Sequence, residues 1–235
     1  MEDMVLDYGA ITIDNSVLKG EGYRFDEGLL KQMNQFAKSP VKVIQTDVVH
    51  NEAIKHLSED IKNARTSIAQ ALRSASKHFK ISAKKIDEAK ALLVSDISDY
   101  EIANARLRQY YQKINCELLI SSDYVELERL MQMYFEVEAP FEQSKDKKHE
   151  FPDAIALLAI EGWAEKNDIN VIAVSNDKGW KAFADNSHRI TVIEKLADAF
   201  EVFLPHNKIN EIISQLREDE LLDGENHVLS KITQA

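Results

Sequence analysis

The sequence predicts an α/β protein built around a parallel sheet, and three observations support this prediction. First, short apolar runs, mostly rich in β-branched residues and each the length of one strand, recur at residues 10–13, 41–44, 117–120, 171–174 and 190–193. Second, helical stretches separate these runs, and strands that alternate with helices form parallel sheets covered on both faces. Third, the run at 171–174 is apolar at every position, which is typical of a central strand.

The stretch between the second and third runs is too long for a simple crossover helix. Residues 52–111 contain no Gly or Pro, which predicts two or three long helices, with a break near Ile81 where Ser82 can cap a new helix. We therefore expect a helical insertion over about residues 53–113, and a charged loop at 138–149. The main domain is expected to cover residues 1–205, followed by a helical tail over 206–235.

The composition is that of an ordinary soluble protein, with 44% apolar and 29% charged residues. Cys116 is the one cysteine, so no disulfide can form within the chain. The first residues lack the basic flank and apolar run of a signal peptide, and no stretch reaches the ~18 consecutive apolar residues of a membrane span. These features predict a cytoplasmic protein with no membrane partner.

The charge is distributed unevenly. A formal net charge of −11 argues mildly against a nucleic-acid partner, because phosphate binding requires a positive surface. However, no acid lies between Asp60 and Asp87, and seven basic residues do: Lys62, Arg65, Arg73, Lys77, Lys80, Lys84 and Lys85. Without those seven, 22 basic residues face 40 acidic ones, which leaves −18 for the rest of the chain.

Four acids fall where the chain leaves a predicted strand or enters the helix that follows, the edge at which parallel sheets bind ligands. They are Asp14, Glu52, Asp153 and Asp177. Acids gathered at one edge repel each other unless a cation lies between them, and oxygen ligands suit Mg²⁺ or Mn²⁺. Taken singly, each acid is equally compatible with a helix cap, a turn or a solvated side chain. Only their joint placement indicates a metal site.

Four short motifs surround these acids: IDNSVL at residues 13–18, VVHNE at 48–52, EFPDA at 150–154 and VSND at 174–177. In this order they resemble the PIN-domain family, over roughly residues 8–200 apart from the helical region. The segment KKHEFPD at 147–153 is similar to a mainly bacterial and largely uncharacterised branch. The resemblance implies a three-layer α/β/α fold with about five parallel strands. It also implies a Mg²⁺- or Mn²⁺-dependent endoribonuclease, in which a metal-activated water attacks phosphorus and leaves 5′-phosphate and 3′-hydroxyl ends.

By position, the resemblance also implies roles for individual residues. The same four acids would be both catalytic and metal-binding, and Glu150 would be a fifth metal-site acid. Candidate supports for them are Asn15, Ser16 and Asn176.

Several cations are candidates for contact with substrate phosphates. Lys147, Lys148 and Lys178 flank the acids, and Lys77, Lys80 and Lys84 represent the basic stretch. The alternative is that these are solvated charges, or that they pair with acids elsewhere in the fold. Trp180, close to Asp177, is a candidate for substrate contact, whereas Trp163 is expected in the core.

The most specific prediction is therefore an endoribonuclease that cleaves single-stranded RNA, an activity suited to a toxin, a stress effector or an anti-phage effector. Two alternatives remain open: a structure-specific or single-strand DNA nuclease, and a non-catalytic PIN-like module that binds RNA or a protein. Homodimers and an inhibitory protein partner are further expectations from the resemblance.

Overall fold

The computed structural model describes residues 8–94, 96–143 and 147–204, and the predicted tail at 206–235 lies outside these described residues. Five strands form one sheet, with all neighbours parallel and in the order β3-β2-β1-β4-β5. The strands are β1 (Tyr8–Ile13), β2 (Lys42–Thr46), β3 (Cys116–Leu119), β4 (Asn170–Val174) and β5 (Ile190–Ile193). Each overlaps one of the five apolar runs, so the predicted sheet and the α/β class are confirmed. β4 lies between β1 and β5, and Val171, Ile172, Ala173 and Val174 are fully buried, as expected of a central strand.

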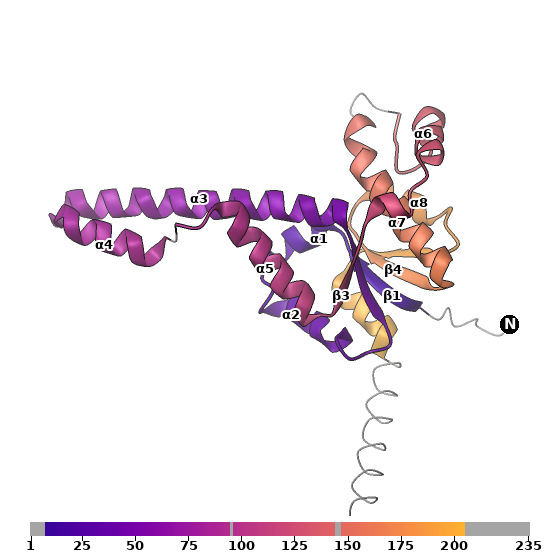
Figure 1. The fold of residues 1–235 in the computed structure, drawn as a ribbon, viewed down its shortest axis with the longest axis horizontal. Coiled ribbons are helices and arrows are strands. Elements are labelled where there is room, and N and C mark those ends of the chain that lie inside the picture. The colour runs from indigo at the N-terminus through magenta and orange to yellow at the C-terminus, as the bar shows by residue number, and fades with distance from the viewer. Residues whose placement is uncertain (1–7, 95, 144–146, 205–235) are drawn as a thin grey trace, which may run out of the picture.

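Helices cover both faces of the sheet (Figure 1) and give the predicted three-layer architecture. One face packs against α1 (Asn15–Gly20), α2 (Gly28–Gln32), and parts of α3 (Asp47–Phe79) and α5 (Asp99–Lys113). The other face packs against α6 (Leu127–Glu136), α7 (Phe151–Asn167) and α8 (Lys178–Ala184). Short 3₁₀ turns are η1 (Met33–Phe36), η2 (Ser121–Asp123) and η3 (Lys147–Glu150). In the described part of the chain, no helix is long and apolar enough to cross a bilayer.

The predicted helical insertion is an arm that projects from this domain (Figure 1). α3 is one helix of 33 residues, and α4 (Ala83–Leu93) folds back along it before α5 returns to the sheet. Lys80 adopts a left-handed conformation that ends α3, and Ser82 is the N-cap of α4, which confirms the predicted break. The helix begins at Asp47, earlier than the expected 53, because the Thr46 side chain accepts a hydrogen bond from the Val49 amide and caps it there.

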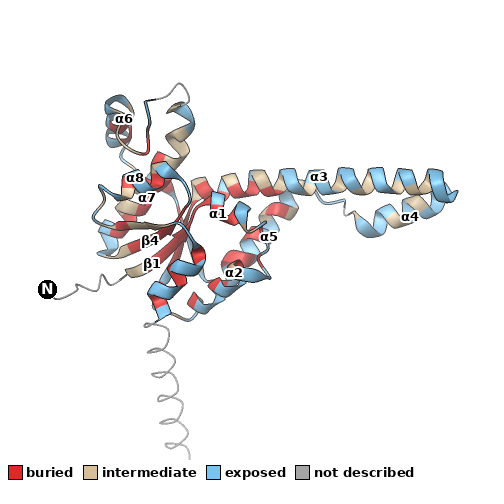
Figure 2. Cartoon of the chain, turned by 180° about the vertical axis from the view of Figure 1, so that it is seen from behind, coloured by how far each residue is buried: buried red, intermediate tan, exposed pale blue. Residues whose placement is uncertain are grey.

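The arm, which we define as residues 62–93, differs from the rest of the protein in its burial (Figure 2). Leu57 is the last buried residue of α3, and no residue of α4 is buried. The first turns of α3 therefore belong to the core of the domain, whereas the arm lies outside it.

Candidate active site at the carboxyl edge of the sheet

Asp14 directly follows β1, the central strand of the sheet. It is buried, with 5% of its surface exposed. The pairing of Ile13 with Val174 brings the end of β4 alongside, and Ser175 Oγ donates a hydrogen bond to Asp14 Oδ2 at 2.9 Å. Ser16 Oγ donates to the same oxygen. Burial raises the pKa of Asp14 above its usual value, and the hydroxyl donors counteract only part of this effect.

Asp153 lies in the first turn of α7 and is partly buried. The indole Nε1–H of Trp180 donates to its Oδ1 at 2.8 Å, and Trp180 itself is fully buried on α8. Burial, followed by the carboxylates of Asp14, Asp177 and Glu52, raises the pKa of Asp153 to about 7. The other three predicted acids therefore lie near enough to Asp153 for their charges to act on it.

Asp177 is exposed and caps α8, where its Oδ1 accepts hydrogen bonds from the amides of Gly179 at 2.7 Å and Trp180 at 3.2 Å. Its own amide donates to Ser175 Oγ at 3.0 Å, which connects it to the group around Asp14. The ordinary role of a helix cap is thus real for Asp177, but it engages only one carboxylate oxygen. Among the described residues, neither Oδ2 of Asp177 nor Oδ2 of Asp153 accepts a hydrogen bond.

Glu52 reaches the site from the second turn of α3 and is partly buried. Burial raises its pKa, and the neighbouring charge of Asp14 raises it further. The start of α3 is fixed to the end of β3 by Asp47, whose Oδ1 accepts hydrogen bonds from the amide and hydroxyl of Ser121. The capped and anchored first turn of α3 therefore determines where Glu52 lies.

The donor set of this site fits a hard divalent cation. All four candidate ligands are carboxylates, and neighbouring acids add to the effect of burial in raising the pKa of Asp153 and of Glu52, as expected of repelling negative charges. No three Asp, Glu, His or Cys side chains among the described residues are arranged to hold one ion together. This arrangement still fits Mg²⁺, which keeps several waters and is bound through one or two carboxylates.

Of the three predicted supports, the structure places Ser16 against Asp14 and Asn15 elsewhere. The amide oxygen of Asn15 accepts a hydrogen bond from the hydroxyl of buried Tyr23 at 2.9 Å. Asn176 is exposed at the edge of the site.

Two residues that hold the carboxylates were missed in the sequence. Ser175 lies in the VSND motif, directly after β4. Its place next to Asp14 can be inferred once β1 and β4 are paired. Trp180, considered in the sequence only for a place near the substrate, is fully buried, and its indole donates a hydrogen bond to Asp153. Trp163 is buried in the core, as expected.

Glu150 and Lys147, near the start of α7, are engaged by neighbouring segments. Glu150 Oε2 accepts a hydrogen bond from the amide of Glu142 at 2.7 Å, which closes the loop before the helix. The ammonium of Lys147 donates to the carbonyl of Tyr134 and lies 4.3 Å from the centroid of its ring. Lys148 and Lys178 are exposed.

Lys77, Lys80 and Lys84 are far from the acids. Lys77 follows Glu52 by 25 positions on one continuous helix, which corresponds to roughly 37 Å at a rise of 1.5 Å per residue. Because α3 ends at Lys80, Lys84 lies on α4 instead of continuing the same helix face. The structure does not bring these lysines and the acids into one pocket.

In a comparison with known protein families, a family model described as a PIN domain matches residues 11–180, from β1 into α8. All four acids lie within this range. Neither the curated proteins nor the solved structures contain a match to this chain.

Proposed function

This chain belongs to the PIN-domain family, and from that premise we propose that it is a divalent-metal-dependent endonuclease acting on single-stranded RNA. Proteins of this family are typically metal-dependent nucleases. In this chain, hydrogen bonds hold Asp14, Asp153 and Asp177 at one edge of the sheet, and burial together with the neighbouring acids raises the pKa of Asp153 to about 7. Burial and neighbouring negative charges disfavour the carboxylate form of an acid. A cation bound beside the acid would stabilise that carboxylate form.

Asp14, Glu52, Asp153 and Asp177 would hold the Mg²⁺ or Mn²⁺. When bound, such an ion lowers the pKa of its water and neutralises charge on a phosphoryl group. The surrounding residues orient the ligands: Ser16 and Ser175 hold one oxygen of Asp14, and Trp180 holds one oxygen of Asp153. The second oxygens of Asp153 and Asp177 remain available to a ligand.

The preference for RNA follows from the family resemblance, and the basic arm supports a polyanionic substrate. The direct experiment is to incubate the purified protein with end-labelled single-stranded RNA and, separately, DNA of the same sequence. We expect cleavage of RNA with Mn²⁺ or Mg²⁺, products with 5′-phosphate and 3′-hydroxyl ends, and no cleavage in EDTA. Cleavage that persists in EDTA would contradict the metal requirement, and faster cleavage of DNA would contradict the choice of substrate.

A further inference from the structure

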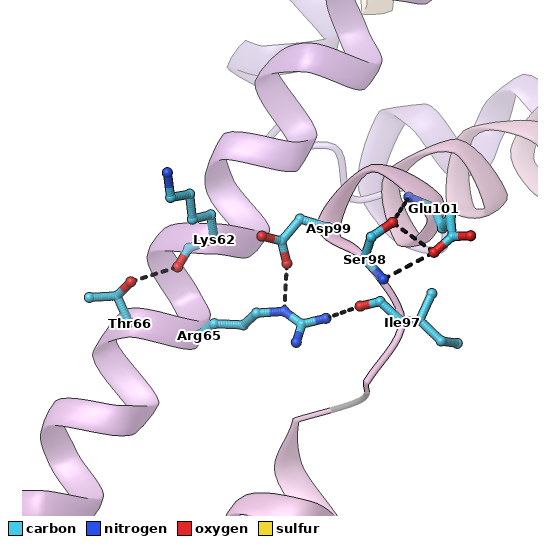
Figure 3. A network of polar contacts seen from close by, with 7 residues as sticks. All are labelled: Lys62, Arg65, Thr66, Ile97, Ser98, Asp99 and Glu101. Atoms are coloured by element: carbon cyan, nitrogen blue, oxygen red, sulfur yellow. Dashed lines mark hydrogen bonds and ion pairs between the residues drawn. The ribbon is translucent and has the colours of Figure 1, made fainter.

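The arm is fixed to the domain at its base. There the guanidinium of Arg65 on α3 pairs with Asp99 at 2.5 Å and donates to the carbonyl of Ile97 (Figure 3). Ser98 and Glu101 form a capping box at the start of α5, directly beside this ion pair. These contacts join α3 to the start of α5. They therefore help to hold the arm in one direction relative to the sheet.

The arm carries a positive charge that acids among the described residues neutralise only in part. Residues 62–93 contain eight basic and two acidic side chains, a formal charge of +6, in a chain with a net charge of −11. Arg65 is the member paired with an acid outside the arm, and Lys84 lies 4.0 Å from Glu88 on α4 itself. Among the described residues, Arg73, Lys77, Lys80 and Lys85 form no ion pair. Within the part of the chain that the structure describes, the alternative that this basic stretch pairs with acids elsewhere in the fold therefore holds for Arg65 alone.

The tip of the arm also presents an aromatic ring. Phe79, the last residue of α3, is 78% exposed and lies between Lys77 and Lys80 in the sequence. A phenylalanine side chain stabilises a protein when it is buried, and at this exposed position the fold gains little from it. Exposed aromatic rings beside cations are the means by which proteins bind single strands, since bases stack on the ring and phosphates contact the cations.

The tip and the acids are separated by a fixed length of helix. From Glu52 to Phe79 is 27 positions on α3, or about 40 Å at 1.5 Å per residue. A strand that keeps duplex-like stacking advances about 3.4 Å per nucleotide, so about 12 nucleotides would span this distance. A hexamer stacked in the same way covers about 20 Å, which is half of the span.

We propose that residues 77–80 at the tip of the arm form a second contact for single-stranded RNA, about 40 Å from the acids. The contact makes binding dependent on strand length. This inference rests on the proposed nuclease function and adds a substrate class to it, namely strands long enough to reach both sites. A second copy of this chain is a less favoured occupant of the tip, because two arms of charge +6 repel each other.

The test compares two arm variants of the full-length protein, Phe79→Ala and the double variant Lys77→Gln with Lys80→Gln. Matched controls are Phe135→Ala, an equally exposed aromatic residue on α6, and Lys38→Gln, an exposed lysine of the main domain. Steady-state cleavage is measured on an unstructured hexamer and on a 24-mer of RNA. For the 24-mer, we expect the arm variants to raise KM about five- to tenfold with kcat unchanged, because they remove binding that is remote from the reaction. For the hexamer we expect no change, and the controls should behave as wild type.

A binding measurement that does not require cleavage separates the two proposals. In an Asp153→Asn background, affinity for the 24-mer is measured against salt concentration. The double lysine variant should flatten the slope of log affinity against log salt by about 1.4, which is 0.7 per phosphate contact. If wild type cleaves RNA but the arm variants match it on the 24-mer, the arm contact is refuted and the nuclease function stands. If no RNA is cleaved but the arm variants lose affinity and slope, the arm contact stands and the nuclease function fails. Equal losses in hexamer and 24-mer cleavage, or a change from dimer to monomer by light scattering, would also overturn the remote contact.

Discussion

One helix joins the two most different regions of this protein. At its start, Glu52 of α3 enters a crowded group of acids that includes buried Asp14. At its end, Phe79 lies in solvent among cations. The acidic region has negative charge held close to the core by neighbouring hydroxyl and indole groups. The basic arm has positive charge and no buried residue among its described members.

The difference indicates what each task requires of the fold. Carboxylates that repel one another stay together only where rigid neighbours hold them, and the sheet edge with α7 and α8 provides these neighbours. An arm that contacts a ligand far from the sheet must be long and have a soluble surface, but it needs few buried residues. Substitutions near the sheet edge should therefore alter chemistry and stability together, whereas substitutions at the exposed tip of the arm should alter binding with little effect on stability.

The largest expected effect is the loss of catalysis when one acid is neutralised. Asp14→Asn and Asp153→Asn should each lower kcat by at least about a hundredfold, the scale on which one electrostatic group at a reacting centre acts. Asp185→Asn is the matched control, because Asp185 is exposed on the same face of the sheet and lies outside the group of acids. A wild-type rate in either acid variant would show that the group is not catalytic.

The next largest effect concerns Trp180. Trp180→Phe removes the indole donor to Asp153, and loss of a partner that orients a metal ligand typically costs 10- to 100-fold in metal affinity. Trp163→Phe is a close control, because Trp163 is equally buried and its Nε1 donates to Glu117 at 3.2 Å. Both variants should lose stability, but only Trp180→Phe should weaken Mn²⁺ binding in a titration. Equal Mn²⁺ affinity in the two variants would mean that Trp180 only fills the core.

A smaller effect is expected in the pH dependence of stability without metal. The folded state raises the pKa of Asp153 from the usual 3.8 to about 7, so the folded protein keeps a proton that the unfolded chain has released. Stability from this group is therefore complete below pH 3.8 and is lost as the pH rises through about 7. Asp153→Asn should remove this loss, and the variant should be more stable than wild type at pH 8 by roughly 1–3 kcal/mol. Urea unfolding in EDTA at pH 5 and pH 8 measures the difference, and an equal pH dependence in both proteins would refute the assignment.

The smallest expected effect is at the base of the arm. Arg65→Gln removes an ion pair whose two side chains are about a quarter exposed. We expect a loss of stability of about 1 kcal/mol or less, with unchanged cleavage of a hexamer. Thermal unfolding measures the change in stability, and hexamer kinetics measure the change in cleavage. A large loss of hexamer cleavage would show that the arm base and the acids are coupled.

Much of the fold was predictable because its signals are local. The strands follow from apolar runs, and the break between α3 and α4 follows from a helical pattern that pauses at Ile81 and Ser82. The placement of Asp14 and Asp177 at the carboxyl edge of the sheet followed from a general property of parallel sheets. The hydrogen bond from Trp180 to Asp153 and the direction of Lys147 were not predictable, because each depends on how α7 packs against α8 or α6. The separation of the basic residues from the acids required the length of α3, which composition alone does not give.

The central claim is that the acids at this edge of the sheet, Asp153 among them, bind a divalent cation, and Mn²⁺ titration by calorimetry tests it most directly. At pH 8, above the pKa of about 7 for Asp153, wild type should bind Mn²⁺. The Asp153→Asn variant should bind at least about tenfold more weakly, the minimum expected when a metal ligand is replaced. The Asp185→Asn control should match wild type. Equal affinity in all three proteins, or no Mn²⁺ binding by wild type, would contradict the claim.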